Sequence, residues 1–477
     1  MNGYTRHGNL HGMYAADPVP RSLSANQLDW INVKDFGAVG DGSANDTVAL
    51  QRALDKATRI TSATATWGGV GLLIPPGHYM ANGLTCVNLP GLHIMGSGRY
   101  NTILECNSNG GILLTLGQTT NLNQMWTSIS NLTLSGGSTA SSNRNNTLLK
   151  LIRTPWVTLS NVSFRGNPAL TSHGNGISTG HGLHLLGVWD CTAYFCHFEE
   201  LGDATHYPLY VELDGAQVAD NCNNWYFFGC RWEHNDGTDV YMSTDSTYYT
   251  EAFRFVCCKW ESTSHIGTRL AAYLQGNYLD FLDCTFANYR RIIQVTADAG
   301  DTSNFVRIMN CQTHSTGVTF LANDVLFNLD RCNDCIIEGN RITGGFTALP
   351  PAGTAYISLG ANATRTRIGP NNYLDTWQPP ASYISDSGTG TVVYRNTGYV
   401  TENSGTATIA SGATLVNVTH GLSYTPAAAD IVVVATNNPT NDPGHIWVDT
   451  ITSTQFRINC RADPGASGLN LSWSVQK

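Results

Sequence analysis

The sequence predicts an all-β protein: a parallel β-helix closed by one N-terminal helix and followed by a small antiparallel β-sandwich. Three observations predict this organisation. A short motif recurs through the middle of the chain at intervals of 26 to 34 residues. Only 13% of the residues are charged, against about a quarter in an average globular protein, while glycine is frequent, with 48 residues. After residue 400 the chain changes to short alternating segments separated by turns.

The composition argues against several classes of partner. The 26 basic and 35 acidic residues give a net charge of −9 with no basic block, so we expect no nucleic-acid partner. No apolar run approaches the roughly 20 residues of a membrane-spanning helix, so we expect no membrane partner. The N-terminus lacks the charged and then apolar plan of a secretory signal, which predicts synthesis in a cytoplasm.

The N-terminal part predicts an arm and a capping helix. Residues 1–30 are irregular and are expected to form a flexible arm, and the β-helix is expected over 31–395. A helix is predicted at about 44–60, with Ser43, Asn45 or Asp46 placed to cap it. Its apolar positions, Leu50, Ala53, Leu54 and Ala57, fall on one helical face. Such a helix would cover the first coil, whose open sheet edge would otherwise pair with other chains.

The repeat is clearest around five cysteines. In the segments Cys230-Arg-Trp-Glu and Cys258-Lys-Trp-Glu, an aromatic residue follows the cysteine by two positions and a glutamate by three. A unit this short cannot bury its own hydrophobic face, so successive units must stack as the coils of a solenoid, about 4.8 Å apart. The stacking predicts an interior ladder of Cys196, Cys230, Cys258, Cys284 and Cys311, beside Phe198, Trp232, Trp260 and Phe286.

The cysteines do not predict a metal centre. A free thiol behaves as a small hydrophobe and suits a dry ladder. The spacing follows the coil rather than a ligand loop, and Cys332 and Cys335 have no second pair beside them, so we expect no metal ion and no cofactor. On the outer side, the stacked positions Arg254, Asp280 and Arg307 predict a structural charge ladder.

Residues 400–477 predict an antiparallel β-sandwich. The expected strands are 406–409, 414–418, 430–435, 445–448, 455–458 and 469–473, with turn residues between them.

Two parts of the chain resemble known families. The string from Val33 to Ala57, followed by Leu73-Ile-Pro-Pro-Gly-His-Tyr79, resembles the opening of the pectate-lyase-like β-helix superfamily. The string Val418-Thr-His-Gly-Leu-Ser-Tyr-Thr-Pro426 resembles small C-terminal domains of phage tail proteins. The pairing resembles a bacteriophage tailspike or depolymerase.

That resemblance implies a right-handed β-helix and a homotrimer on the virion tail, made in the host cytoplasm and acting at the bacterial cell surface. It implies a bacterial surface polysaccharide as one partner and a phage tail or adaptor protein as another. The C-terminal domain would then serve trimerisation or carbohydrate binding.

Three stacked glutamates are the first candidates for catalysis. Glu199, Glu233 and Glu261 follow the ladder cysteines by three positions. Carboxyl groups one coil apart would lie near 5 Å, which suits a retaining glycoside hydrolase, and two coils apart they approach the wide end of the inverting range. Like charges this close would raise the pKa of one group and keep it protonated. Asp236 and Asp239, in an expected loop after Glu233, are the second choice.

The candidate substrate-binding residues are His234, Lys259, Arg231, Tyr248, Tyr249 and Tyr207. The aromatic members would offer an apolar face to a sugar ring. An equally open alternative makes the glutamates ordinary surface ion pairs with Arg231 and Lys259.

The sequence therefore predicts an endo-acting glycoside hydrolase of a capsule, O-antigen or exopolysaccharide. One alternative is a polysaccharide lyase that recruits Lys259, Arg254, His234 and Tyr226 for β-elimination from a uronate. The other alternative is a receptor-binding spike that does not cleave.

Overall fold

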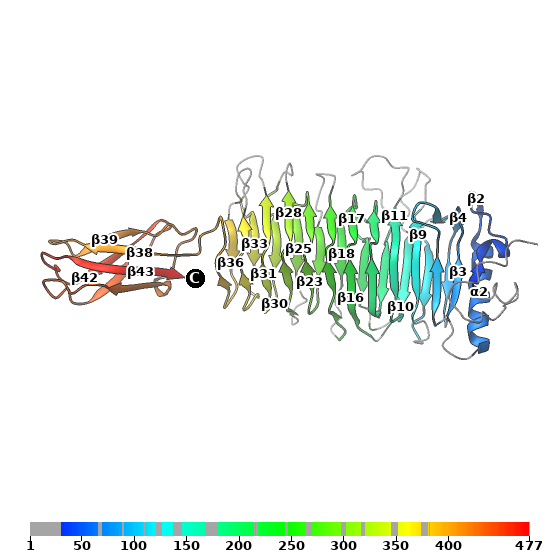
Figure 1. Cartoon of the computed structure of the whole chain (residues 1–477), viewed down its shortest axis with the longest axis horizontal. Coiled ribbons are helices and arrows are strands. Elements are labelled where there is room, and N and C mark those ends of the chain that lie inside the picture. Colours follow the sequence, from blue (N-terminus) through cyan, green and yellow to red (C-terminus); the bar gives the residue numbers. More distant parts are fainter. Residues whose placement is uncertain are drawn as a thin grey trace, which may run out of the picture.

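The structure is a computed structural model. It describes residues 30–476 except 65–68, 88–89, 109, 121–125, 137–145, 167–179, 214, 216–217, 219, 244–246, 263–269, 297–301, 316–319, 345–351, 374–379 and 381. The expected arm at 1–30 lies outside the described residues apart from Trp30, which begins the first strand. Figure 1 shows a long β-solenoid with a helix across its N-terminal end and a smaller β-domain beyond its C-terminal end.

The larger sheet of the solenoid is parallel and bends around the coils. Its strands are β1 (Trp30–Asn32), β2 (Asp41–Asn45), β3 (Val70–Leu73), β4 (Gly77–Ala81), β6 (Leu92–Met95), β7 (Thr102–Cys106), β9 (Ser128–Ser135), β11 (Thr158–Arg165), β13 (Trp189–Tyr194), β14 (His197–Glu199), β16 (Cys222–Phe228), β17 (Arg231–Glu233), β19 (Thr250–Glu251), β20 (Arg254–Val256), β21 (Lys259–Glu261), β23 (Asp280–Leu282), β24 (Thr285–Ala287), β27 (Arg307–Met309), β28 (Gln312–Ser315), β31 (Ile336–Glu338), β32 (Arg341–Gly344), β34 (Arg367–Ile368), β35 (Asn372–Tyr373) and β37 (Val392–Val393).

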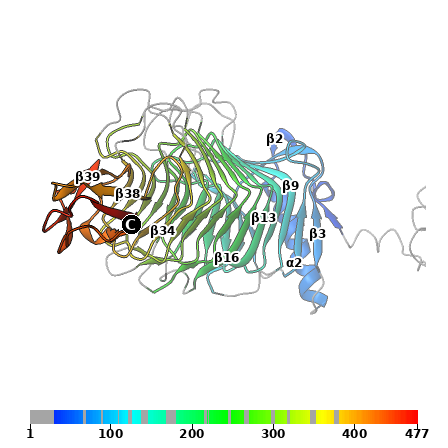
Figure 2. The same ribbon diagram turned by 60° about the vertical axis from the view of Figure 1, so that its left-hand side comes forward.

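The second sheet closes the coil on the other side. Its strands are β5 (Leu84–Cys86), β8 (Ile112–Gly117), β10 (Thr147–Ile152), β12 (Leu183–Leu186), β15 (Leu209–Glu212), β18 (Thr238–Met242), β22 (Leu270–Leu274), β25 (Arg291–Val295), β29 (Val325–Leu329), β33 (Ala355–Leu359) and β36 (Ser382–Asp386). A short pair, β26 (Ser303–Asn304) with β30 (Cys332–Asn333), lies between them. Figure 2 shows the strands of successive coils running side by side along the solenoid.

The core confirms the vertical stacking of like residues. The Lys259 N–H donates to the Cys230 carbonyl at 2.9 Å, which places Cys258 over Cys230 on the next coil. All five ladder cysteines are buried, and burial raises the pKa of the Cys230, Cys284 and Cys311 thiols. A parallel aromatic stack follows, with centroid distances of 4.7, 4.9, 4.6 and 4.9 Å through Phe164, Phe198, Trp232, Trp260 and Phe286.

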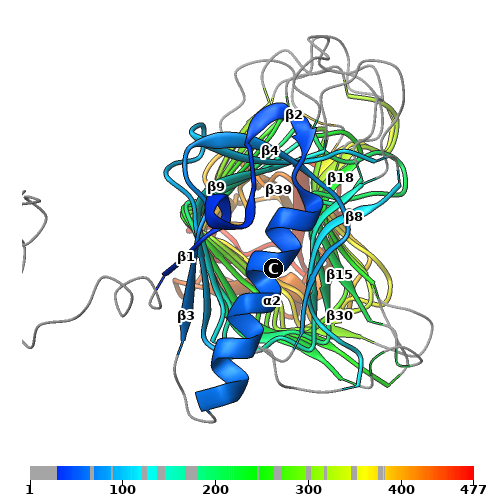
Figure 3. The same ribbon diagram turned by 90° about the vertical axis from the view of Figure 1, so that its right-hand side faces the viewer.

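The capping helix begins later than expected. The helix α2 (Thr47–Thr64) lies across the open end of the first coils, as Figure 3 shows. It starts three residues after the expected 44 because Asp41–Asn45 forms β2, which pairs with β4. Asn45 Oδ1 accepts the Thr47 N–H at 3.1 Å, whereas the Asp46 carboxylate accepts the N–H groups of Val39 and Gly40.

The predicted charge ladder is present on the outer side of the larger sheet. Arg254, Asp280 and Arg307 occupy the same position on successive coils. Arg307 donates to both Asp280 oxygens, at 2.6 and 2.5 Å, and Arg254 Nε lies 3.6 Å from Oδ2. The two guanidinium groups cover the carboxylate, which is only 3% exposed.

One bend of the larger sheet fixes the direction of the side chains that follow it. At this bend seven successive coils each carry a left-handed residue, with φ between 53° and 62°: Asn131, Asn161, Phe195, Gly229, Cys257, Asp283 and Asn310. Gly, Asn and Asp adopt this conformation at the lowest energetic cost, which explains why asparagine recurs near the ladder cysteine. Phe195 and Cys257 depart from that preference.

The C-terminal residues form the expected antiparallel β-sandwich. One sheet contains β38 (Glu402–Ile409), β43 (Leu469–Gln476) and β40 (Ile431–Ala435), and the other contains β39 (Leu415–Thr419), β42 (Gln455–Cys460) and β41 (Ile446–Asp449). Short 3-10 helices occur at η1 (Val33–Phe36) and η2 (Ala428–Asp430). The Tyr424 ring packs against both the sandwich core and the solenoid core. Within the described residues, no helix has the length and apolar character needed to cross a membrane.

Candidate functional site

Two outward rows of side chains cross the short strands after the bend. The strands β14, β17 and β21 have three residues each, so the first and third point outward while the aromatic second residue points into the core. The pairing register stacks His197, Arg231 and Lys259 in one row and Glu199, Glu233 and Glu261 in the other. The three glutamates therefore lie one above another on successive coils.

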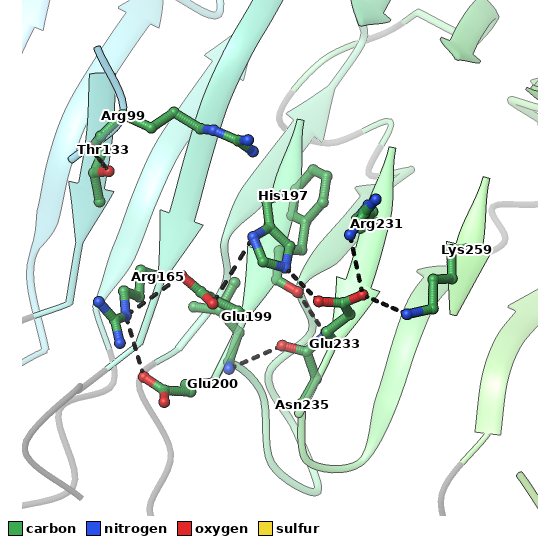
Figure 4. Close-up of polar contacts among 12 residues, drawn as sticks. Arg99, Thr133, Arg165, His197, Glu199, Glu200, Arg231, Glu233, Asn235 and Lys259 are labelled. Atoms are coloured by element: carbon green, nitrogen blue, oxygen red, sulfur yellow. Dashed lines mark hydrogen bonds and ion pairs between the residues drawn. The ribbon is translucent and has the colours of Figure 1, made fainter. Parts of the chain in front are cut away.

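Basic side chains alternate with the glutamates, as Figure 4 shows. Glu233 Oε2 lies 3.0 Å from His197 Nε2, and Oε1 lies 3.0 Å from Lys259 Nζ. Lys259 Nζ also lies 2.5 Å from Glu261 Oε2, so this lysine bridges two coils. The ion pairs that the alternative interpretation expected are thus present.

Glu199 has longer contacts. Its Oε1 lies 3.4 Å from Arg165 Nε, and its Oε2 lies 3.8 Å from His197 Nδ1. The Oε1 atom is buried and accepts no hydrogen bond within the described structure. Glu199 is therefore held less tightly by cations than Glu233 or Glu261.

The expectation of a raised carboxyl pKa does not hold at Glu233. The hydrogen bond from His197 lowers its pKa to about 2, helped by the hydrogen bond from Lys259 and opposed by burial. The hydrogen bond to Glu261 raises the pKa of Lys259, with a smaller contribution from Glu233. Because cations stand between the stacked carboxylates, Glu233 is ionised at neutral pH.

A groove of about 570 Å³ opens beside these rows. Its polar lining comes from Arg99, His197, Arg231 and Lys259, and its most exposed aromatic residues are Tyr100 and Phe195, at 67% and 56%. The glutamates are not among the lining residues. They lie two residues farther along the same strands, in contact with His197, Arg231 and Lys259.

Of the residues that line the groove, sequence reasoning named only Arg231 and Lys259 as site candidates, and it missed Arg99, Tyr100, Phe195 and His197 among others. Arg99 and Tyr100 lie in the turn between β6 and β7, and the pairings β6–β9, β9–β11 and β11–β13 carry this turn to the same bend as Phe195. No spacing in the sequence connects residues almost a hundred positions apart. His197 occupies the same position in the repeat as Arg231 and Lys259, so the alignment of the repeats could have identified it as a site residue.

Phe195 owes its place to the glycine on the next coil. A Cβ atom at Gly229 would lie 2.7 Å from Phe195 Cε1, so only glycine lets the ring lie over this position. The Phe195 ring also meets Phe228 edge-on, with centroids 5.7 Å apart. The left-handed backbone at Phe195 thus holds an aromatic ring at the mouth of the groove.

The second-choice acids lie elsewhere. Asp239 is not in a loop: it belongs to strand β18, is buried, and accepts a hydrogen bond from the Tyr289 hydroxyl, which points to a structural role. The Asp236 N–H donates to the Leu201 carbonyl at 2.8 Å, and the His234 N–H donates to the Glu261 carbonyl at 3.2 Å. Neither Asp236 nor His234 lines the groove.

The candidate tyrosines are also away from the groove. One face of the Tyr207 ring is covered by Tyr241, with centroids 4.3 Å apart and ring planes 7° apart, and burial raises the pKa of Tyr207 to about 12. Tyr248 packs partly against the solenoid core, whereas Tyr249 is 44% exposed. Their part in substrate binding stays a prediction.

The described residues contain no group of three or more His, Cys, Asp or Glu side chains placed to hold a metal ion.

Comparisons with known sequences cover only part of the chain. The family model described as rhamnogalacturonase A/epimerase, pectate lyase-like, matches residues 30–202. The mannuronan C5-epimerases AlgE2 and AlgE1 of Azotobacter vinelandii are each 38% identical over 80 residues, which is 16% of this chain. The match spans only 7% and 5% of those two proteins.

Comparisons with solved structures cover nearly the whole chain. ORF18 of Geobacillus virus E2 is 14% identical, with a TM-score of 0.58 over 94% of this chain and 79% of that chain. A mutant tailspike protein of E. coli bacteriophage HK620, in complex with a pentasaccharide, is 11% identical, with a TM-score of 0.56 over 98% and 97%. The Dettilon tailspike protein is 13% identical, with a TM-score of 0.52 over 95% and 96%. The chain therefore has the right-handed parallel β-helix fold of these solved structures, and its residues 30–202 match a pectate-lyase-like family model.

Proposed function

We propose that this chain is a phage tailspike that binds and degrades a bacterial surface polysaccharide in the groove beside Glu199, Glu233 and Glu261. The observation that carries the proposal is the position of this groove beside a stacked row of carboxylates, which lie two residues farther along the strands than the basic side chains of its lining. Tyr100 and Phe195 offer exposed rings of the kind on which a sugar can lie. A similar fold in the HK620 tailspike protein holds a pentasaccharide, which supports a saccharide ligand here.

The reaction that we propose is hydrolysis of the glycosidic bond by two carboxyl groups. Glu233, with its lowered pKa, serves as the ionised nucleophile that bonds to the anomeric carbon as the leaving oxygen departs, and water activated by Glu199 then hydrolyses this glycosyl ester. Glu199, on the preceding coil, has the longest contacts to cations and serves as the proton donor to the leaving oxygen. The spacing of one coil is near the separation of a retaining pair.

The first experiment incubates the protein with purified capsular, O-antigen and exopolysaccharide preparations from a panel of bacteria. New reducing ends without the ultraviolet absorbance of an unsaturated uronate support hydrolysis. New reducing ends with that absorbance contradict hydrolysis and indicate elimination. Binding without any cleavage contradicts an enzymatic function and leaves a spike that only adheres.

The second experiment compares the variants Glu199→Gln, Glu233→Gln and Glu261→Gln on the polysaccharide that is cleaved. Loss of an acid or a base lowers the rate by roughly 100-fold or more, and we expect this for Glu199→Gln and Glu233→Gln. Glu402→Gln is a matched control, because Glu402 is 42% exposed and lies in the C-terminal domain. Unchanged rates in all three variants would show that the carboxylate row is structural.

The quaternary and virion assignments are part of the same proposal. We propose a homotrimer on the phage tail, attached through a tail or adaptor protein, with the C-terminal sandwich in trimerisation or carbohydrate binding. Light scattering of the purified protein, with and without residues 400–477, measures the number of chains in the oligomer directly. A monomeric full-length chain would contradict the trimer.

A further inference from the structure

The groove contains a guanidinium group that has no counter-ion among the residues that the structure describes. Arg99 projects from its turn toward His197 and the groove, as Figure 4 shows. Its backbone carbonyl accepts a hydrogen bond from Thr133, which fixes the turn. Within the described part of the chain, the Arg99 side chain takes part in no ion pair, and the groove lining contains no carboxylate.

The other cations of the groove differ in how far they are neutralised. Lys259 lies between Glu233 and Glu261, at 3.0 and 2.5 Å, and is therefore paired. Arg231 is 59% exposed, and its nearest carboxylate oxygen, on Glu233, is 3.8 Å away. Among the described residues that line the groove, Arg99 and Arg231 are thus the cations least neutralised by the protein.

This local charge is opposite to that of the whole chain. With a net charge of −9, the protein as a whole repels polyanions. A groove lined by basic side chains reverses that field locally and draws an anionic group to this place. The planar fork of an arginine matches the paired oxygens of a carboxylate or a sulfate, and neighbouring aromatic rings contact the apolar face of a sugar.

We infer that the groove binds an acidic saccharide, with Arg99 and Arg231 holding its anionic group while Tyr100 and Phe195 contact the sugar ring. This inference rests on the proposed function, because it names the substrate class of the same groove. It assigns to Arg99 a binding role that is independent of whether the bond is broken by hydrolysis or by elimination.

The test measures binding of the full chain to four named polymers by affinity electrophoresis. Dextran and dextran sulfate share one backbone and differ in charge. Alginate and polygalacturonate carry carboxylates in place of sulfate, so they separate the two kinds of anion. We expect retardation by at least one of the three acidic polymers, weakening with added salt, and none by dextran.

The variants locate the binding. Arg99→Ala and Arg231→Ala should each weaken binding to the retained acidic polymer by roughly tenfold or more, the usual scale of a lost charge-assisted hydrogen bond. Arg395→Ala is the matched control, because Arg395 is 78% exposed and lies near the end of the solenoid. Equal binding of dextran and dextran sulfate, no binding of any acidic polymer, or wild-type binding by both groove variants would each overturn the inference.

Failure of this inference is distinguishable from failure of the proposed function. If the glutamate variants lose cleavage while Arg99→Ala binds and cleaves normally, the depolymerase stands and the acidic ligand is wrong. If acidic polymers bind through Arg99 but no polysaccharide is cleaved, the anionic site stands and the enzymatic function is wrong. Thermal unfolding of each variant controls for folding, and the Arg99 side chain makes no hydrogen bond within the described residues whose loss would disturb it.

Discussion

His197 Nε2 lies 3.0 Å from Glu233 Oε2, and the two residues belong to adjacent coils of the solenoid. They are 36 positions apart in the chain, so the contact exists only when both coils are stacked in register. The electrostatics of the candidate site therefore depends on the stacking of the coils. Unfolding measured as a function of pH reports on the ionisation of Glu233 and on the stability of the fold together.

The stability contributed by Glu233 should disappear at low pH. Because its pKa falls from the usual 4.5 to about 2 on folding, its ionisation stabilises the native state above pH 4.5, and this contribution is lost as the pH falls toward 2. The shift corresponds to at most roughly 3 kcal/mol. We expect Glu233→Gln to have a lower melting temperature than wild type at pH 6, with the difference shrinking steadily below pH 4.5.

Glu402→Gln provides the reference for that titration, because Glu402 is exposed and its carboxylate lies 3.8 Å from Arg395 Nε. Its melting temperature should follow that of wild type throughout. A constant difference between Glu233→Gln and wild type from pH 6 to pH 2 would contradict the lowered pKa of Glu233.

Removing the carboxylate of the charge ladder should destabilise the solenoid. Asp280→Ala leaves Arg254 and Arg307 stacked as like charges around an empty position. Breaking a buried ion pair from one side costs about 3 kcal/mol or more. Unfolding in guanidinium chloride, followed by tryptophan fluorescence, should show a lower midpoint. Asp334→Ala, which removes a more exposed partner of Arg365, should have a much smaller effect.

Gly229 should control the groove through Phe195. Gly229→Ala brings a Cβ atom to 2.7 Å from Phe195 Cε1 and also forces alanine into a left-handed conformation, at φ 62°. Gly83→Ala also forces alanine into a left-handed conformation, at φ 65°, but its Cβ atom would have no heavy atom of a non-neighbouring residue within 4 Å. In both variants the left-handed backbone should lower the free energy of unfolding by about 1 kcal/mol. Only Gly229→Ala should also weaken polysaccharide binding, and equal binding by the two variants would contradict the role of Phe195.

The thiols should differ sharply in reactivity. Of the 13 cysteines, Cys257 is exposed and the other 12 are buried. Ellman's reagent should therefore modify one thiol per native chain and 13 after denaturation, since burial keeps the reagent from the other thiols. Cys257→Ser should abolish the native reaction. Rapid reaction of several thiols in the native protein would mean that the ladder is open to solvent.

Much of the solenoid could be predicted because its signal is local and repeated. The intervals between Cys196 and Cys311 specify which residues stack. From the sequence alone, that stacking predicts Glu199, Glu233 and Glu261 in one row, as the strand register has them. The C-terminal strands were predicted for a similar reason, since alternation and turn residues mark them within short windows of sequence.

The groove could not be predicted, because its residues come together only in three dimensions. Arg99 and Tyr100 reach it from a turn three coils earlier, and Phe195 reaches it through a backbone conformation that aromatic residues rarely adopt. The glycine at position 237 predicts a loop around Asp239. The pairing of β18 with β15 and β22 instead makes Asp239 part of a buried strand. Likewise, pairing of β2 with β4 moved the start of α2.

The two ends of the solenoid are both covered. The helix α2 lies over the first coils, and the rings of Tyr383, Tyr399 and Tyr424 close the last coils against the sandwich. A stack of coils loses its outermost members first, much as a helix frays from its termini. In the described part of the chain, neither end of the solenoid therefore offers an uncovered coil at which a protease or a detergent could begin to unfold it.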